Sequence, residues 1–136
     1  MEDEIRIKVS SDIDMVPARQ KGRELANKLG FTQTDATLIA TAISEVARNI
    51  IVHVGVGEII ISGSSEGGRD CIVVVARDAG PGIADVAKAM QDGQSQEGSM
   101  GLGLPGSRRL MDEFTIESEV GLGTTVTMKK WKSWDV

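Results

Sequence analysis

The sequence predicts a two-layer α/β (α+β) sandwich, in which a mixed, mainly antiparallel sheet carries helices on one face. Apolar and polar residues alternate in the first and last strand-like segments, at residues 5–9 and 124–131. Strands of this kind keep one face in water, whereas the strands of a parallel sheet covered on both faces are continuous apolar runs. The expected order of elements, β-α-α-β-β-α-α-β-β, is also typical of a two-layer sandwich.

Two helices follow the first strand, and each has local start and stop signals. Ser11 or Asp12 can cap a helix that Gly30 ends, and Thr32 or Thr34 can cap a longer helix that reaches about residue 53. Beyond them we expect strands at 58–62 and 71–77, joined by a hairpin loop at 63–70. Short helices are expected at 83–90 and 103–111, on either side of a polar, mobile stretch at 92–99. The last expected strands are at 114–119 and 124–131.

Length and composition limit what the chain can do. Its 136 residues suit one domain, 1–136, and its 40% hydrophobic and 26% charged residues are typical of a water-soluble globular protein. A net charge of −5 argues against a nucleic-acid partner. The single cysteine, Cys71, lies in an apolar run and cannot form an internal disulfide. Because there is no apolar run of about 18 residues and no signal peptide, we expect a cytoplasmic protein without a membrane partner.

A carboxylate and an amide recur at helical spacing in the longer helix. Glu45 and Asn49 are one turn apart and project from nearly one face, while Ala42, Val46 and Ile50 form an apolar stripe that should meet the sheet. Mg²⁺ prefers hard oxygen ligands, so Asn49 is a candidate metal ligand, and Glu45 is a candidate base for an attacking hydroxyl. Taken alone, the pair is better explained as two polar residues on a solvated helix face.

A second motif, Asp78-x-Gly80-x-Gly82, follows the most apolar predicted strand. A carboxylate only accepts hydrogen bonds and the exocyclic amino group of adenine donates them, so Asp78 is a candidate adenine reader. Gly80 and Gly82 would let the backbone approach a flat base closely, although a simple turn after a strand explains them too. The hydroxyl of Thr124 is a candidate support for the Asp78 carboxylate, and hairpin geometry explains that segment about equally well.

A third motif, Gly101-Leu102-Gly103-Leu104, opens the helix expected after the polar stretch. With Gly106 it matches the G-x-G-x-x-G pattern of dinucleotide-binding folds, but those folds require an apolar strand directly before the first glycine, and the preceding residues are polar. The free N–H groups of a helix start suit a polyphosphate instead. In this order the three motifs predict one site for ATP and Mg²⁺.

These segments, together with Gly123-Thr124, look like the N, G1, G2 and terminal boxes of the GHKL superfamily, which includes gyrase, Hsp90, histidine kinases and MutL and shares the Bergerat ATP-binding fold. The small size resembles the branch of bacterial anti-sigma-factor serine kinases. Segments 77–85, 89–93 and 106–114 are similar to the switch kinases of the stressosome. The resemblance implies that Asn49 holds Mg²⁺, Glu45 is the catalytic base, Asp78 binds adenine, and Gly101 and Gly103 hold phosphates.

The resemblance also implies partners. The kinase would phosphorylate a serine on a STAS-domain scaffold protein and, once released, would bind and activate a PP2C-type phosphatase that starts a sigma-factor cascade. Two alternatives stay open: an anti-sigma factor that binds its sigma factor directly, and a binding switch that uses the nucleotide only for stability. Residues 92–100 contain no Arg or Lys to neutralise a transferring phosphoryl group. We therefore expect a transfer that is slow or that the partner completes.

Overall fold

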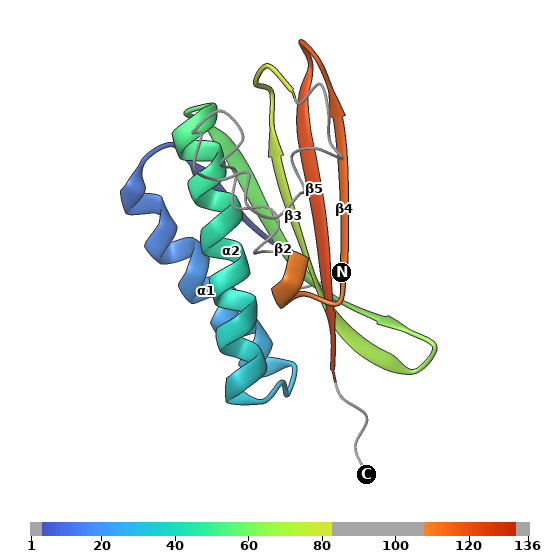
Figure 1. Cartoon of the computed structure of the whole chain (residues 1–136). Helices are drawn as coiled ribbons and strands as arrows, with labels where there is room; N and C mark the ends of the chain where they lie inside the picture. Colours follow the sequence, from blue (N-terminus) through green and yellow to red (C-terminus); the bar gives the residue numbers. More distant parts are fainter. Residues whose placement is uncertain (1–3, 83–107, 133–136) are drawn as a thin grey trace.

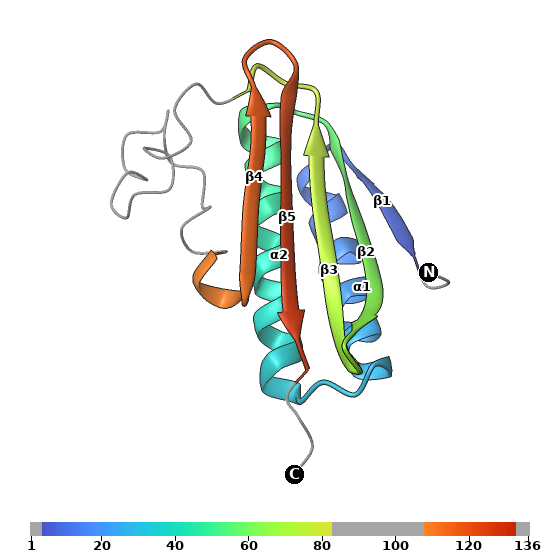
Figure 2. The same ribbon diagram turned by 90° about the vertical axis from the view of Figure 1, so that its right-hand side faces the viewer.

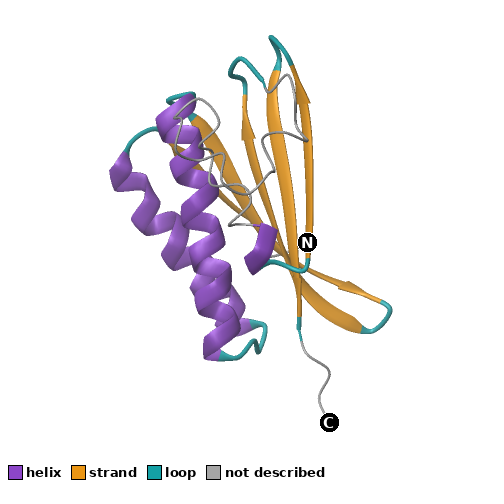
Figure 3. Cartoon of the chain, viewed as in Figure 1, coloured by secondary structure: helices purple, strands orange, loops and turns teal. Residues whose placement is uncertain are grey.

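The computed structural model describes residues 4–82 and 108–132, in which two helices cover one face of a five-stranded sheet (Figures 1 and 3). The strand order is β1-β2-β3-β5-β4, and all four neighbouring pairs in this described sheet are antiparallel. Figure 2 looks onto the opposite face of the sheet, with α1 and α2 behind it. The predicted fold class is confirmed. Since β3 and β4 both run antiparallel to β5, they are parallel to each other with β5 between them.

Most elements lie where the sequence predicts them. The first predicted short helix, the polar stretch 92–99 and the start of the second short helix lie outside the described residues, although residues 108–110 are helical. None of the described helices is long and apolar enough to cross a membrane. The elements are β1 (Ile5–Val9), a 3-10 turn (Asp12–Asp14), α1 (Met15–Lys28), α2 (Gln33–His53), β2 (Gly57–Glu66), β3 (Arg69–Asp78), β4 (Glu113–Glu119) and β5 (Gly123–Trp131).

An acidic side chain organises the start of α1. Oδ2 of Asp14 accepts hydrogen bonds from the backbone N–H groups of Ser10, at 2.8 Å, and Ser11, at 3.2 Å. These donors stabilise the ionised carboxylate, and the bond from Ser10 is the main reason why the pKa of Asp14 lies below its ordinary value. Of the two caps that the sequence predicts, Ser11 caps the 3-10 turn that leads into α1. The N-cap residue of α1 itself is Asp14, so the prediction placed the start of this helix a few residues too early.

Local hydrogen bonds also explain the change of direction between α1 and α2. Gly30 adopts φ +92°, a left-handed conformation that suits glycine, and the N–H groups of Gly30 and Phe31 donate to the carbonyls of Asn27 and Ala26 at 3.1 and 3.0 Å. Oγ1 of Thr32 then accepts the backbone N–H three residues later, at 3.1 Å. Of the two predicted caps for α2, Thr32 is therefore the one that is used.

The hairpin of β2 and β3 is longer than the sequence predicts. Residues 63–70 were expected to form a loop, but β2 continues to Glu66, β3 starts at Arg69, and only Gly67 and Gly68 form the turn. Both glycines have positive φ, +62° and +80°, as in the two-residue turns whose twist matches that of the strands. Glycine and serine have low strand propensity, but pairing with the apolar β3 overrides it here.

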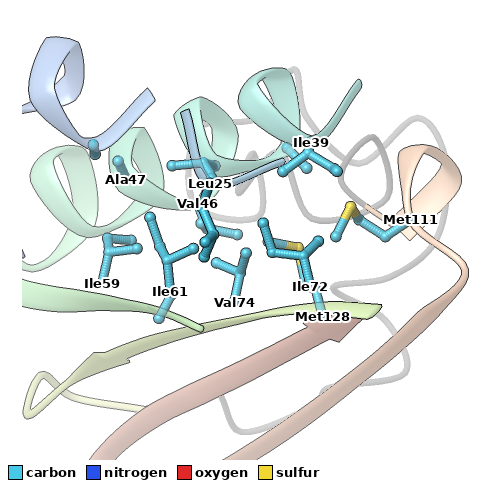
Figure 4. Packing of buried hydrophobic residues seen from close by; sticks show 14 of the residues in the cluster. Leu25, Ile39, Val46, Ala47, Ile59, Ile61, Ile72, Val74, Met111 and Met128 are labelled. Atoms are coloured by element: carbon cyan, nitrogen blue, oxygen red, sulfur yellow. The ribbon is translucent and has the colours of Figure 1, made fainter. Parts of the chain in front are cut away.

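The core fills the space between the helices and the sheet (Figure 4). Gly22 on α1 faces Ile43 on α2 so closely that a Cβ atom would collide with the Ile43 side chain, which lets the two helices pack at short distance. The thiol of Cys71 is buried, and this burial raises its pKa. Side chains buried to 2% exposure or less include Ile39, Ile43, Val46 and Ile50 on α2, Ile59 and Ile61 on β2, Ile72 and Val74 on β3, and Met128 on β5.

Candidate functional site

The ends of several strands and of one helix meet at one end of the molecule. We call it the Asp78 end, and it is uppermost in Figure 1. Here β3 ends at Asp78 and α2 ends at His53, while β4 ends at Glu119 and turns into β5 at Gly123. The sheet places Asp78 directly opposite Thr124. The predicted second motif and the predicted Thr124 therefore lie side by side, although 46 positions separate them in the sequence.

Polar side chains form the last cross-strand row on the helix-facing side of the sheet at this end. Alternation along β3 and β5 puts Asp78 and Thr124 on the same face as the buried Ala76 and Val126. The register places Ser118 of β4 opposite Thr124, so the row runs Asp78–Thr124–Ser118. The next row inward is apolar. A polar row at the end of an otherwise apolar face is suited to binding a polar ligand.

The hydroxyl of Thr124, which the sequence suggests as a support for the Asp78 carboxylate, contacts a side chain on the other neighbouring strand. Oγ1 of Thr124 lies 2.8 Å from Oγ of Ser118, and that Oγ donates to the carbonyl of Gly123 at 3.2 Å. Oδ1 of Asp78 accepts the N–H of Gly80 at 2.8 Å, which turns the chain directly after β3. Sequence reasoning missed Ser118, although its place in the alternation of the inward Phe114 and Ile116, two positions after Ile116, was a usable signal.

The glycines of the second motif are required by contacts within the protein. A Cβ atom on Gly80 would lie 2.7 Å from Cγ2 of Val54, and one on Gly82, where φ is +80°, would collide with the carbonyl of Glu119. The N–H of Gly121 donates to the carbonyl of Pro81 at 2.8 Å, so the turn between β4 and β5 holds the 79–82 loop. The predicted close approach of these glycines to a base stays a prediction, because packing already explains them.

The amide of Asn49 has an unusual environment. Its Oδ1 is buried and has no hydrogen-bond partner in the described part of the chain. Nearly all buried polar atoms in proteins are paired, so an orphan of this kind calls for a partner from outside the fold. A hard cation fits an amide oxygen. Residues 4–82 and 108–132 contain no cluster of three or more His, Cys, Asp or Glu for a metal.

Glu45 lies one helical turn before Asn49, and both side chains are half-buried. Neither of them lines the pocket at the Asp78 end, which has a volume of about 830 Å³ and reaches Asp78 and Gly80. Its other walls come from the end of α2, from β1 and β2, and from the 79–81 loop. The structure thus brings Asp78, Gly80, Gly82 and Thr124 together. Gly101, Leu102, Gly103 and Leu104 lie outside the described residues.

Residues 9–130 match the family of histidine kinase-like ATPase domains. The chain belongs to this family. This histidine kinase-like ATPase is 45% identical over 131 residues to the serine/threonine-protein kinase RsbT of Bacillus subtilis (strain 168). The aligned region covers 96% of this chain and 98% of the relative. It is 35% identical over 120 residues to the anti-sigma F factor of Thermoanaerobacter sp. (strain X514), covering 84% of this chain and 82% of that protein.

A solved structure shows the same fold. The crystal structure of the RsbU and RsbW domains of a Mycobacterium tuberculosis protein superposes with a TM-score of 0.62 and 20% sequence identity. The match covers 98% of this chain and 33% of that one, so this chain spans about a third of its length. Together with the likeness to RsbT, family membership makes this histidine kinase-like ATPase an ATP-dependent protein kinase of the serine/threonine class.

Proposed function

We propose that the chain is a cytoplasmic protein-serine kinase and partner-switching regulator that uses Mg-ATP to phosphorylate a serine on a STAS-domain scaffold protein. Once released, it activates a PP2C-type phosphatase through the regulatory domain of that enzyme, in a sigma-factor stress-response cascade. Relatives named as RsbT and as anti-sigma F factors support the coarser statement, a serine kinase in sigma-factor regulation. The scaffold and the phosphatase come from the sequence resemblance.

The observation that carries the proposal is the buried, unpaired Oδ1 of Asn49. An amide oxygen that lacks a partner in the protein is expected to find one in Mg²⁺ when ATP binds. Bound together with ATP, the cation neutralises negative charge on the phosphates. Asn49 would hold that cation, and the backbone around Gly101, Leu102, Gly103 and Leu104 would hold the phosphates.

Asp78 reads the base in this proposal. Its Oδ1 is occupied by the N–H of Gly80, which fixes the carboxylate and leaves Oδ2 to accept the amino group of adenine. Thr124 lies opposite on the same face, within reach of the same base. Glu45, one turn from the metal-binding amide, would accept the proton of the attacking serine hydroxyl.

Exposed apolar side chains on segments at the Asp78 end favour a role in partner binding. Large apolar side chains on proteins that act alone are seldom exposed in groups, and such groups mark interaction sites. In the described residues the exposed large apolar side chains all belong to segments at the Asp78 end, where α1 starts, α2 ends and β4 turns into β5. They are Ile13, Val16, Val52, Val56, Val120 and Leu122.

Phosphotransfer from γ-labelled ATP tests the proposal. The protein is incubated with a STAS-domain protein encoded in the same genome, with Asn49→Ala as the disabled variant. Asn27→Ala is the matched control, because Asn27 is an exposed asparagine on α1. We expect label on a serine of the partner with the wild type and the control, and none with Asn49→Ala.

Absence of label with intact ATP binding would refute the kinase proposal and favour a nucleotide-stabilised binding switch. The identity to anti-sigma F factors makes a direct anti-sigma factor the second candidate. Co-purification of a sigma factor with the chain, in the absence of any STAS-domain protein, would support that candidate.

A further inference from the structure

The hydrogen bonds of the Ser118 and Thr124 hydroxyl groups determine which of the two is the donor. Ser118 has one hydroxyl proton, and its Oγ donates to the carbonyl of Gly123 at 3.2 Å. The same Oγ lies 2.8 Å from Oγ1 of Thr124. Both hydrogen bonds exist together only if the hydroxyl of Thr124 is the donor to Ser118, because each hydroxyl has a single proton. The proton of Thr124 therefore points along the row, away from Asp78.

This orientation changes what Thr124 offers to a neighbouring ligand. With its proton used, Oγ1 of Thr124 keeps only lone pairs and acts as an acceptor. Thr124 is 7% exposed, the one buried polar residue in the described part of the chain, so water does not readily take over its hydrogen bond. Residues directly opposite each other on one face of an antiparallel pair have Cβ atoms about 5 Å apart, so Thr124 acts on the same small region as Asp78.

Two acceptors side by side discriminate between purine bases. The 6-amino group of adenine is a donor, while guanine carries an acceptor oxygen at the same position. With position 6 of the base facing both side chains, the Asp78 carboxylate and an acceptor-only Thr124 both oppose that oxygen. A Thr124 hydroxyl free to rotate would instead donate to guanine, or to Asp78, and either would weaken the preference for adenine.

We infer that Ser118 is a positioning residue for base specificity: by accepting the proton of Thr124, it keeps Thr124 an acceptor and so favours ATP over GTP. The inference rests on the proposed function, since it requires the base to lie at Asp78. Ser118 acts through Thr124 and need not touch the nucleotide itself.

The test is the ratio of the dissociation constants for Mg-GTP and Mg-ATP, measured by calorimetry on the full chain. Ser118→Ala frees the Thr124 proton, and Ser118→Thr keeps a hydroxyl at the same place. Ser44→Ala is the control, because Oγ of Ser44 is another partly buried hydroxyl and donates to the carbonyl of Ala40 at 3.1 Å. We expect Ser118→Ala to lower the ratio by about 3- to 10-fold, the usual worth of one hydrogen bond, while Ser118→Thr and Ser44→Ala keep the wild-type ratio.

The possible results separate the two proposals. If Ser118→Ala weakens binding of both nucleotides equally, or lowers only the free energy of unfolding, Ser118 is structural and the inference is wrong. An unchanged ratio with normal ATP binding overturns the inference alone. A wild type that binds neither nucleotide overturns the proposed function, and the inference with it.

Discussion

Replacing Asn49 by alanine is expected to stabilise the nucleotide-free protein while it removes Mg-dependent ATP binding. Most substitutions of half-buried residues destabilise a protein, so the expected direction is unusual. It follows from the buried Oδ1 of Asn49, which has no partner among the residues that the structure describes. The amide is retained at a cost to stability, which is common for groups that bind a ligand.

Three contributions decide the size of the effect. An unsatisfied buried oxygen costs about 1–3 kcal/mol, and alanine removes that cost. Alanine is also the better helix former, by up to about 0.7 kcal/mol, in the interior of α2. Against these stands the loss of dispersion contacts of three half-buried atoms, on the order of 1 kcal/mol. The net expectation is a gain of about 1–2 kcal/mol in the free energy of unfolding, or a rise of roughly 5 °C in Tm.

Urea unfolding of the nucleotide-free protein measures the first effect, with Asn27→Ala as the matched control. Asn27 is exposed near the end of α1, so its replacement changes helix propensity without removing a buried oxygen, and we expect a gain of only a few tenths of a kcal/mol. Calorimetry of ATP binding with Mg²⁺ and with EDTA measures the second effect.

Two results would refute the reasoning. A loss of 1 kcal/mol or more in the nucleotide-free Asn49→Ala protein would mean that the Asn49 amide is satisfied in solution. Wild-type ATP affinity that is the same with Mg²⁺ and with EDTA would remove Asn49 from any metal role.

Other substitutions test the remaining parts of the site and the start of α1. Asp78→Asn keeps an oxygen for the N–H of Gly80 but opposes the adenine amino group with a donor, so calorimetry should show ATP affinity reduced by about 10- to 100-fold, and unchanged affinity would remove Asp78 from the base site. Glu45→Gln should keep ATP binding but lose about 10²–10⁴ in transfer rate, and a near-normal rate would make Glu45 structural. The lowered pKa of Asp14 adds stability that is present above the ordinary aspartate pKa of 3.8 and is lost as the pH falls through the lower value of the folded state. The difference in free energy of unfolding between wild type and Asp14→Asn should therefore shrink as urea titrations move from pH 6 to pH 2, and a constant difference would contradict this assignment.

Local signals in the sequence were sufficient for much of the fold. Gly30 and Thr32 each act within a few residues of their own position, and the structure uses both as expected. The extent of the β2–β3 hairpin was not predictable in this way. Gly63 and its serine neighbours have low intrinsic strand propensity, and they become strand because β3 lies beside them. This pairing depends on both strands of the hairpin, so the propensities of residues 63–66 alone do not reveal it.

In the candidate site, too, local features could be predicted from the sequence and features that depend on strand pairing could not. Asp78 and Asn49 could be chosen as candidates from residue type and spacing, because each lies on an element whose period is visible in the sequence. The partnership of Thr124 with Ser118 depends on strand register, which fixes which side chains share a row. The role expected for Thr124, support of Asp78, stays a prediction, because the side-chain contact that the structure gives its hydroxyl is with Ser118. A register cannot be assigned from composition alone.

The strand order has a consequence for how the chain is made. β5 is the last of the described strands in the sequence, yet it lies between β3 and β4 in the sheet. A ribosome-bound chain that stops before Gly123 therefore has no partner for the facing edges of β3 and β4, and unpaired strand edges promote association between molecules. Unfinished or C-terminally clipped chains should therefore aggregate through these two edges. Such chains lack a central strand of the sheet, not an edge strand.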